Sequence, residues 1–153
     1  MKKLLIVLGM VFLLSGCGEK EIKSLHCTIH SKNVIDGYEV NSTYDAVGEK
    51  GYAKTVTTKE ETVSDSAETL DLFEETIKTT YKNMNDTYGG YTYTVNRESN
   101  KVVADVTIDY SKMNLNKMLE DQPVLDKYIK DGKMLMSGLQ KMYEDLGATC
   151  ESK

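Results

Sequence analysis

The chain has 153 residues, 19 basic and 24 acidic, and its formal net charge at neutral pH is −5. This length is enough for one ordinary domain with its own hydrophobic core. The acidic balance argues against a nucleic-acid-binding protein, which needs a basic surface to neutralise phosphates. It also argues against electrostatic adhesion to anionic lipid as the means of membrane attachment.

The first 17 residues have the pattern of an export signal. Lys2 and Lys3 precede an apolar run from Leu4 to Leu14, and Ser15-Gly16-Cys17 follows. A charged start, a short apolar run and small residues before a cleavage point are typical of a secretory signal peptide. An apolar helix of this length spans only about 16 Å, roughly half of a hydrocarbon core of ~30 Å, so we do not expect it to span a membrane.

The end of this segment, Leu14-Ser15-Gly16-Cys17, resembles a bacterial lipobox. The resemblance implies cleavage before Cys17, a diacylglycerol thioether on its sulfur, and acyl chains such as palmitate at the new amino terminus. An ordinary signal peptide with an incidental cysteine is the alternative. Buried acyl chains contribute ~0.8 kcal/mol per methylene, so two chains anchor a protein stably where one does not.

These features predict three parts of the chain. Residues 1–16 are expected to be a lipoprotein signal peptide, residues 17–24 a lipidated amino terminus and tether, and residues 25–153 a folded domain. The only membrane contact that we expect is through the acylated Cys17. The domain would then lie on the extracytoplasmic face of the cell membrane.

Two cysteines, Cys27 and Cys150, remain once Cys17 carries lipid. An even pair in an exported protein predicts a disulfide, here between the start and the end of the domain. Closing a loop of about 123 residues would stabilise the fold by on the order of 4–5 kcal/mol in the chain-entropy description. Two buried, reduced thiols are the alternative.

The first part of the domain is predicted to be an antiparallel meander. Polar and apolar residues alternate in 25–30 and 38–46, and residues 52–63 are rich in Thr, Val and Tyr. Both features are typical of strands with one buried face. Short segments with turn-forming residues, ending at Gly37 and Gly51, separate the three strands.

The hydrophobic period then changes. In residues 67–84 apolar side chains recur every three or four positions, which predicts a helix with one buried face. Asp65 and Glu68 are placed to cap its first turn. Strand patterns return at 91–95 and 101–110, which predicts a hairpin.

The last part of the chain is predicted to be mostly helical. Short helices are expected at 114–120 and 124–130, the second opened by Pro123. Apolar residues between 134 and 146 predict a further amphipathic helix, and 148–151 a final short strand that brings Cys150 to Cys27. The prediction is a single compact α+β domain: an antiparallel sheet of about five to six strands packed against two main amphipathic helices.

Three phrases beside the lipobox carry a family resemblance: Tyr44 to Thr57 (YDAVGEKGYAKTVT), Val102 to Leu115 (VVADVTIDYSKMNL) and Gly138 to Cys150 (GLQKMYEDLGATC). With them the chain resembles the YehR-like lipoproteins, small bacterial lipoproteins whose domain has no known function. The resemblance covers nearly all of the chain after Cys17. It implies a compact α+β domain on a lipid anchor, and it implies no active site.

Polar clusters predict little chemistry. His26 and His30 flank Cys27, but on a strand about 13 Å separates the two histidines, too far to bind one zinc ion. The acidic run 60–75 lacks the ligand spacing of a calcium loop and predicts a solvated helix face. Asp105 and Asp109 are likewise too far apart on a strand for a close catalytic pair. We therefore predict no catalytic residues, no metal and no cofactor.

The glycine turn between Tyr88 and Tyr93 is the most suggestive local cluster. Tyr88, Tyr91 and Tyr93 could offer a flat surface to a sugar or a peptide. The alternative is that these rings pack over the sheet while the glycines form the turn.

The sequence thus predicts a membrane-anchored extracytoplasmic lipoprotein, a monomer with a noncatalytic binding or envelope-associated role and an unidentified partner. A small solute- or peptide-binding component that works with a transporter is the alternative. An enzyme would need a poised acid or base, and no residue pattern supplies one.

Overall fold

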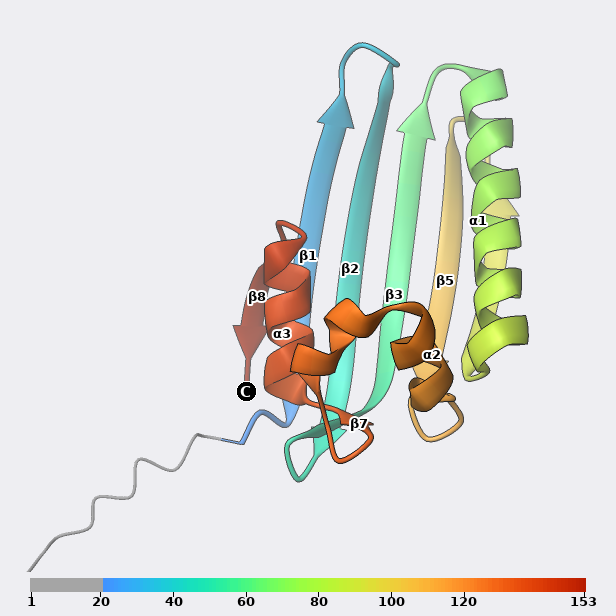
Figure 1. Ribbon diagram of the computed structural model, residues 1–153. Helices are drawn as coiled ribbons and strands as arrows, with labels where there is room; N and C mark the ends of the chain where they lie inside the picture. Colours follow the sequence, from blue (N-terminus) through green and yellow to red (C-terminus); the bar gives the residue numbers. More distant parts are fainter. Residues whose placement is uncertain (1–20) are drawn as a thin grey trace, which may run out of the picture.

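The computed structural model describes residues 21–153 (Figure 1). The expected signal peptide 1–16 and Cys17 lie outside the described residues. The described chain forms eight strands, three α-helices and one 3₁₀ helix: β1 (Ser24–Asn33), β2 (Tyr38–Glu49), β3 (Tyr52–Ser64), α1 (Ala67–Tyr88), β4 (Tyr91–Arg97), β5 (Lys101–Asp109), α2 (Leu115–Asp121), η1 (Pro123–Tyr128), β6 (Ile129–Lys130), β7 (Lys133–Met134), α3 (Met136–Asp145) and β8 (Thr149–Ser152).

Six strands form one antiparallel sheet in the order β4-β5-β3-β2-β1-β8, which confirms the predicted α+β fold. The first three strands form the expected meander, and β5 pairs with β3. The last strand, β8, pairs with the free edge of β1, so the two ends of the described chain lie side by side. The short strands β6 and β7 form a separate hairpin.

The helices cover one face of the sheet (Figure 1). Helix α1 packs along β3, β4 and β5, whereas α3 packs on β1, β3 and β8. Leu70 of α1 and Leu139 of α3 are almost completely buried, as are the sheet residues Val56 and Val102. The sheet can bury one row of side chains per strand because successive residues point to opposite faces.

The predicted amphipathic helix after β3 is present, but its cap differs from the prediction. Ser66 is the N-cap, and its hydroxyl accepts a hydrogen bond from the amide of Thr69. The predicted pair, Asp65 and Glu68, is exposed. The helix ends at Tyr88, where the amide of Gly89 donates to the carbonyl of Asn85.

The segment between β5 and β8 departs most from the prediction. The helix expected at 124–130 is a 3₁₀ helix that ends at Tyr128 and continues into β6. Met134 lies in β7, so α3 begins two residues later than expected, at Met136. Strand β7 is held by its contacts with β3, and η1 packs on α2 and α3. A local sequence pattern does not contain these contacts between distant segments.

The predicted disulfide is present. Cys27 and Cys150 face each other in the β1–β8 pairing, and their sulfurs are bonded. Cys27 is completely buried in the core beneath α3. The bond therefore joins the first and the last strand of the domain at its core.

Candidate functional site

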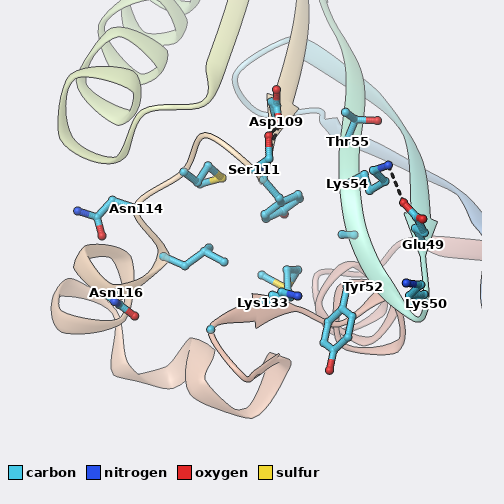
Figure 2. Close-up of a pocket in the computed structure, with 16 residues that line it drawn as sticks. Glu49, Lys50, Tyr52, Lys54, Thr55, Asp109, Ser111, Asn114, Asn116 and Lys133 are labelled. Carbon is cyan, nitrogen blue, oxygen red and sulfur yellow. Dashed lines mark hydrogen bonds and ion pairs between the residues drawn. The ribbon is translucent and has the colours of Figure 1, made fainter.

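An open cavity lies where the β2–β3 turn, the β6–β7 hairpin and the start of α2 meet (Figure 2). Its volume is about 880 Å³, within the range of roughly 300–1,000 Å³ found for small-molecule sites. Residues in the ranges 49–55, 109–116 and 132–134 form its walls. In Figure 1 these elements lie at the end of the sheet where the described chain enters β1.

Backbone contacts fix the wall that the two hairpins form. The amide of Met136 donates to the carbonyl of Gly51 at 2.9 Å, and Tyr52 pairs with Leu135 in an isolated antiparallel bridge. The hydroxyl of Tyr52 donates to Asp131 at 3.3 Å. The β6–β7 hairpin is therefore held against the start of β3, although the two lie far apart in the sequence.

The opposite wall turns sharply after β5. The carboxylate of Asp109 accepts hydrogen bonds from the amide of Ser111 at 3.0 Å and from its hydroxyl at 2.6 Å, an arrangement that stabilises a tight turn. Gly90 allows the turn to approach β4: its φ is +79°, and a Cβ there would lie 2.5 Å from Cγ of Met113. Asn114 then caps the first turn of α2 with its side chain.

Charged side chains surround the mouth of the cavity: Glu49, Lys50, Lys54, Asp109 and Lys133. Lys54 binds Glu49 at 2.7 Å (Figure 2), and this hydrogen bond lowers the pKa of Glu49. Hydrogen bonds from Ser111 and Lys112 lower the pKa of Asp109. Both carboxylates are thus ionised and paired. Within residues 21–153, Lys50 and Lys133 form no ion pair, although the charge of Lys50 adds to the lowering of the pKa of the adjacent Glu49.

Apolar side chains form the floor. Ala53, Leu115 and Met134 are buried, and half-buried Tyr110 and Met113 complete the surface. Burial raises the pKa of Tyr110, so its hydroxyl stays protonated. An apolar lining with a few polar groups at its edge is the usual composition of a ligand-binding site.

The titratable side chains of the cavity lining are two carboxylates, three lysines and two tyrosines. The hydroxyl of Ser111 donates to Asp109, but the lining includes no histidine or cysteine that could activate or act as a nucleophile. Among the described residues, no three His, Cys, Asp or Glu side chains gather as a metal site would require.

Both histidines lie on the face of β1 that the helices leave uncovered. Nδ1 of His26 lies 2.6 Å from Asp45, and Nδ1 of His30 lies 2.6 Å from the side-chain oxygen of Asn41. Both pairs join β1 to β2 through exposed side chains. The histidines therefore have neighbours on the adjacent strand, whereas Cys27 points to the opposite face.

The tyrosines of the glycine turn contact α1 and α2. The hydroxyl of Tyr88 donates to Asp121 at 3.1 Å. The rings of Tyr91 and Tyr93 lie 6.3 and 5.9 Å from the ring of Tyr81 in α1. The ligand surface at Tyr88, Tyr91 and Tyr93 stays a prediction.

One half-buried acid was not expected from the sequence. The acidic run 60–75 is predicted to be a solvated helix face, but Glu60 belongs to β3 and lies on the side that the helices cover. Its carboxylate accepts a hydrogen bond from the hydroxyl of Tyr81 at 2.9 Å, and burial raises its pKa. The signal was available in the alternation of β3, where Thr58 and Thr62 on the same side are buried.

The residues of the cavity were also not singled out by sequence reasoning. Lys50 lies in the turn before Gly51, and Lys133 follows Gly132 at the start of β7. No sequence pattern within either segment connects it with the segment after β5. None of the described helices is long and apolar enough to cross a membrane.

No protein-family profile matches this chain, and no curated protein matches it. Two solved structures are similar to it. The NMR structure of the E. coli YehR protein is 15% identical, covers 84% of this chain and 91% of its own, and has a TM-score of 0.52. The NMR structure of a protein from Streptococcus pneumoniae TIGR4 is 12% identical, covers 99% and 98%, and has a TM-score of 0.47. The similarity to YehR concerns the fold alone, and the chain has a YehR-like fold.

Proposed function

We propose that this chain is a membrane-anchored extracytoplasmic lipoprotein that binds a ligand, without catalysis, in the cavity between β3, α2 and the β6–β7 hairpin. The lipobox-like Leu14-Ser15-Gly16-Cys17 after an apolar run is the observation that carries the anchoring. The cavity is the observation that supports the binding role, because it has the size and composition of a ligand site.

The disulfide supports an exported domain. Disulfides persist in oxidising compartments and are rare in the reducing cytosol. The Cys27–Cys150 bond joins two strands at the buried core, where it adds to the stability of the domain. Such a bond would persist and stabilise the domain if the lipoprotein is exposed to an oxidising exterior.

The second candidate is a solute- or peptide-binding component that works with a transporter. The cavity volume of about 880 Å³ favours it, because this space would accommodate a small molecule. Both candidates place the ligand in the same cavity, and they differ in whether a transporter partner is needed for the protein to act.

Metabolic labelling with radioactive palmitate tests the anchoring. We expect the chain, expressed in a bacterium, to incorporate label and to fractionate with membranes, and Cys17→Ser to lose both. The double variant Cys27→Ser/Cys150→Ser is the matched control, since it removes the other two cysteines and should keep the label. An unlabelled wild-type chain in the soluble fraction would contradict the proposal.

A further inference from the structure

We infer that the cavity takes an anionic amphiphile: a molecule with an acyl or similar apolar chain and a phosphate or carboxylate head group. This ligand class rests on the proposed binding function and specifies it. Two parts of the cavity, its floor and its mouth, match the two parts of such a molecule.

The floor matches the apolar chain. Leu115 and Met134 are buried yet line the cavity, and Met113 covers the end of the floor beside Gly90. Methionine side chains are flexible and adapt to apolar ligands of varied shape. A small polar solute would leave this apolar surface without a partner.

The mouth matches the negative head group. Lys50 and Lys133 are the two lining lysines that form no ion pair with a carboxylate of residues 21–153. Nζ of Lys133 lies 5.3 Å from the ring centroid of Tyr52, which keeps the ammonium beside the opening. Asn114 and Asn116 add amide groups on the α2 side of the cavity, across from Lys50 (Figure 2). The net charge of the whole chain is negative, so the expected preference for an anionic head group is confined to the cavity.

The cavity also lies close to the proposed anchor. The amide of Gly48 donates to the carbonyl of Lys23 at 2.8 Å, and the next residue, Glu49, lines the cavity. Lys23 lies six positions after Cys17, and six residues span at most roughly 20 Å. An acylated Cys17 would therefore hold the cavity near the membrane, which is the richest source of anionic amphiphiles.

The test uses the polypeptide 18–153, which lacks the acylated cysteine. It contains every described strand and helix and both cysteines of the disulfide, and its circular dichroism should show a cooperative thermal transition. The probes are lysophosphatidylglycerol, oleate, lysophosphatidylcholine and glycerol 3-phosphate. The three probes that have an acyl chain are used below their critical micelle concentrations. The first two represent phospholipid and fatty-acid sources of the same chemistry, the third has a zwitterionic head, and the fourth lacks a chain.

Methyl NMR of labelled methionines provides the readout. We expect lysophosphatidylglycerol or oleate to shift Met113 and Met134 saturably, while Met84 of α1, which does not line the cavity, stays in place. The more tightly bound of the two identifies the source. Lysophosphatidylcholine should bind at least tenfold more weakly, and glycerol 3-phosphate should give no shift.

Variants at exposed positions separate the two parts of the site. Lys133→Glu should weaken binding of the anionic probes at least tenfold. Lys130→Glu, on the same hairpin but outside the cavity lining, is the matched control and should change the affinity less than threefold. Asn116→Trp should fill the cavity from an exposed position and abolish binding of every chain-bearing probe.

Three outcomes would overturn the ligand class: no shift of Met113 and Met134 with either anionic amphiphile, equal affinity for the zwitterionic probe, or equal loss in Lys133→Glu and Lys130→Glu. These outcomes are independent of acylation. If the protein is acylated in cells but none of these shifts is observed, the proposed lipid anchor is supported and only the proposed ligand class is excluded.

Discussion

Cys27 of β1 and Cys150 of β8 are direct partners in the strand pairing, and their disulfide spans 123 positions of the chain. Strand β8 has only four residues and a single neighbour, since it forms the edge of the sheet. The disulfide therefore holds in place a short strand that has few hydrogen bonds of its own.

Removing the disulfide should cost about 2–5 kcal/mol of the free energy of unfolding, the usual range for a native disulfide in a small exported domain. We expect Cys27→Ala/Cys150→Ala to unfold at correspondingly lower urea concentration. Reductant should lower the wild-type stability similarly and leave the double variant unchanged. A wild-type protein that reductant does not affect would contradict the role of the bond.

Glu60 should make the folded state less stable as the pH rises, which is opposite to the usual effect of a carboxylate in an ion pair. Because burial raises its pKa in the folded state, the protonated carboxyl is favoured by folding. This contribution is complete below the unfolded pKa of about 4.3 and is lost as the pH rises through the higher folded pKa. Relative to wild type, Glu60→Gln should therefore be more stable at pH 7 than at pH 3, measured by urea unfolding.

The neighbouring residue Glu61 provides a control of opposite sign. It lies on the uncovered face of β3, and its hydrogen bond with Lys101 lowers its pKa. Its contribution is therefore present above the unfolded pKa and is lost as the pH falls. Relative to wild type, Glu61→Gln should be less stable at pH 7 than at pH 3. If both variants change in the same direction, the assignment of the two faces is wrong.

Gly138 should not tolerate a side chain. A Cβ at this position of α3 would lie 2.7 Å from the carbonyl oxygen of Tyr128 and 2.9 Å from its Cα, and backbone atoms have little room to move. Gly138→Ala should lower the free energy of unfolding by roughly 1–3 kcal/mol, although alanine favours helices by about 1 kcal/mol over glycine.

Ser137→Ala is the control for Gly138, because Ser137 is exposed in the same turn of α3. It should be neutral or slightly stabilising in the same urea titration. Equal stability of Gly138→Ala and wild type would show that α3 is not packed on η1 as described.

Substitution of two leucines of α1 by alanine should have very different effects on the free energy of unfolding. Leu70 is 1% exposed and Leu72 is 63% exposed, two positions apart on the same helix. Leu70→Ala should cost about 2–5 kcal/mol through lost burial and the cavity left behind, whereas Leu72→Ala should stay within about 0.5 kcal/mol. Thermal unfolding of both variants checks this, and a large loss in Leu72→Ala would mean that the outer face of α1 is covered in solution.

Much of the fold could be predicted because most strands bury a single face. In β5, Val102, Ala104 and Val106 are buried while Asp105 and Thr107 are exposed, and this alternation is visible in the sequence. The same holds for α1, where the period of three to four places Leu70 inward. The disulfide was predicted from the number of cysteines and from the expected export signal.

The cavity could not be predicted, because its walls meet through distant contacts. The bond from Met136 to Gly51 and the approach of Gly90 to Met113 connect segments that share no local pattern. Met134 was expected in a helix, yet it lies in β7, where the pairing with β6 and the adjoining Tyr52–Leu135 bridge outweigh its helical spacing. Sequence periodicity reports burial, and it does not report which buried segments leave a space between them.

The intact mass of the chain, extracted from the membranes of a bacterial host, tests the central claim most directly. We predict a polypeptide that begins at Cys17, carries a diacylglycerol group with acyl chains, and is two hydrogens lighter than its reduced form. A chain that still begins at Met1, or one that begins elsewhere with an unmodified Cys17, would contradict the account.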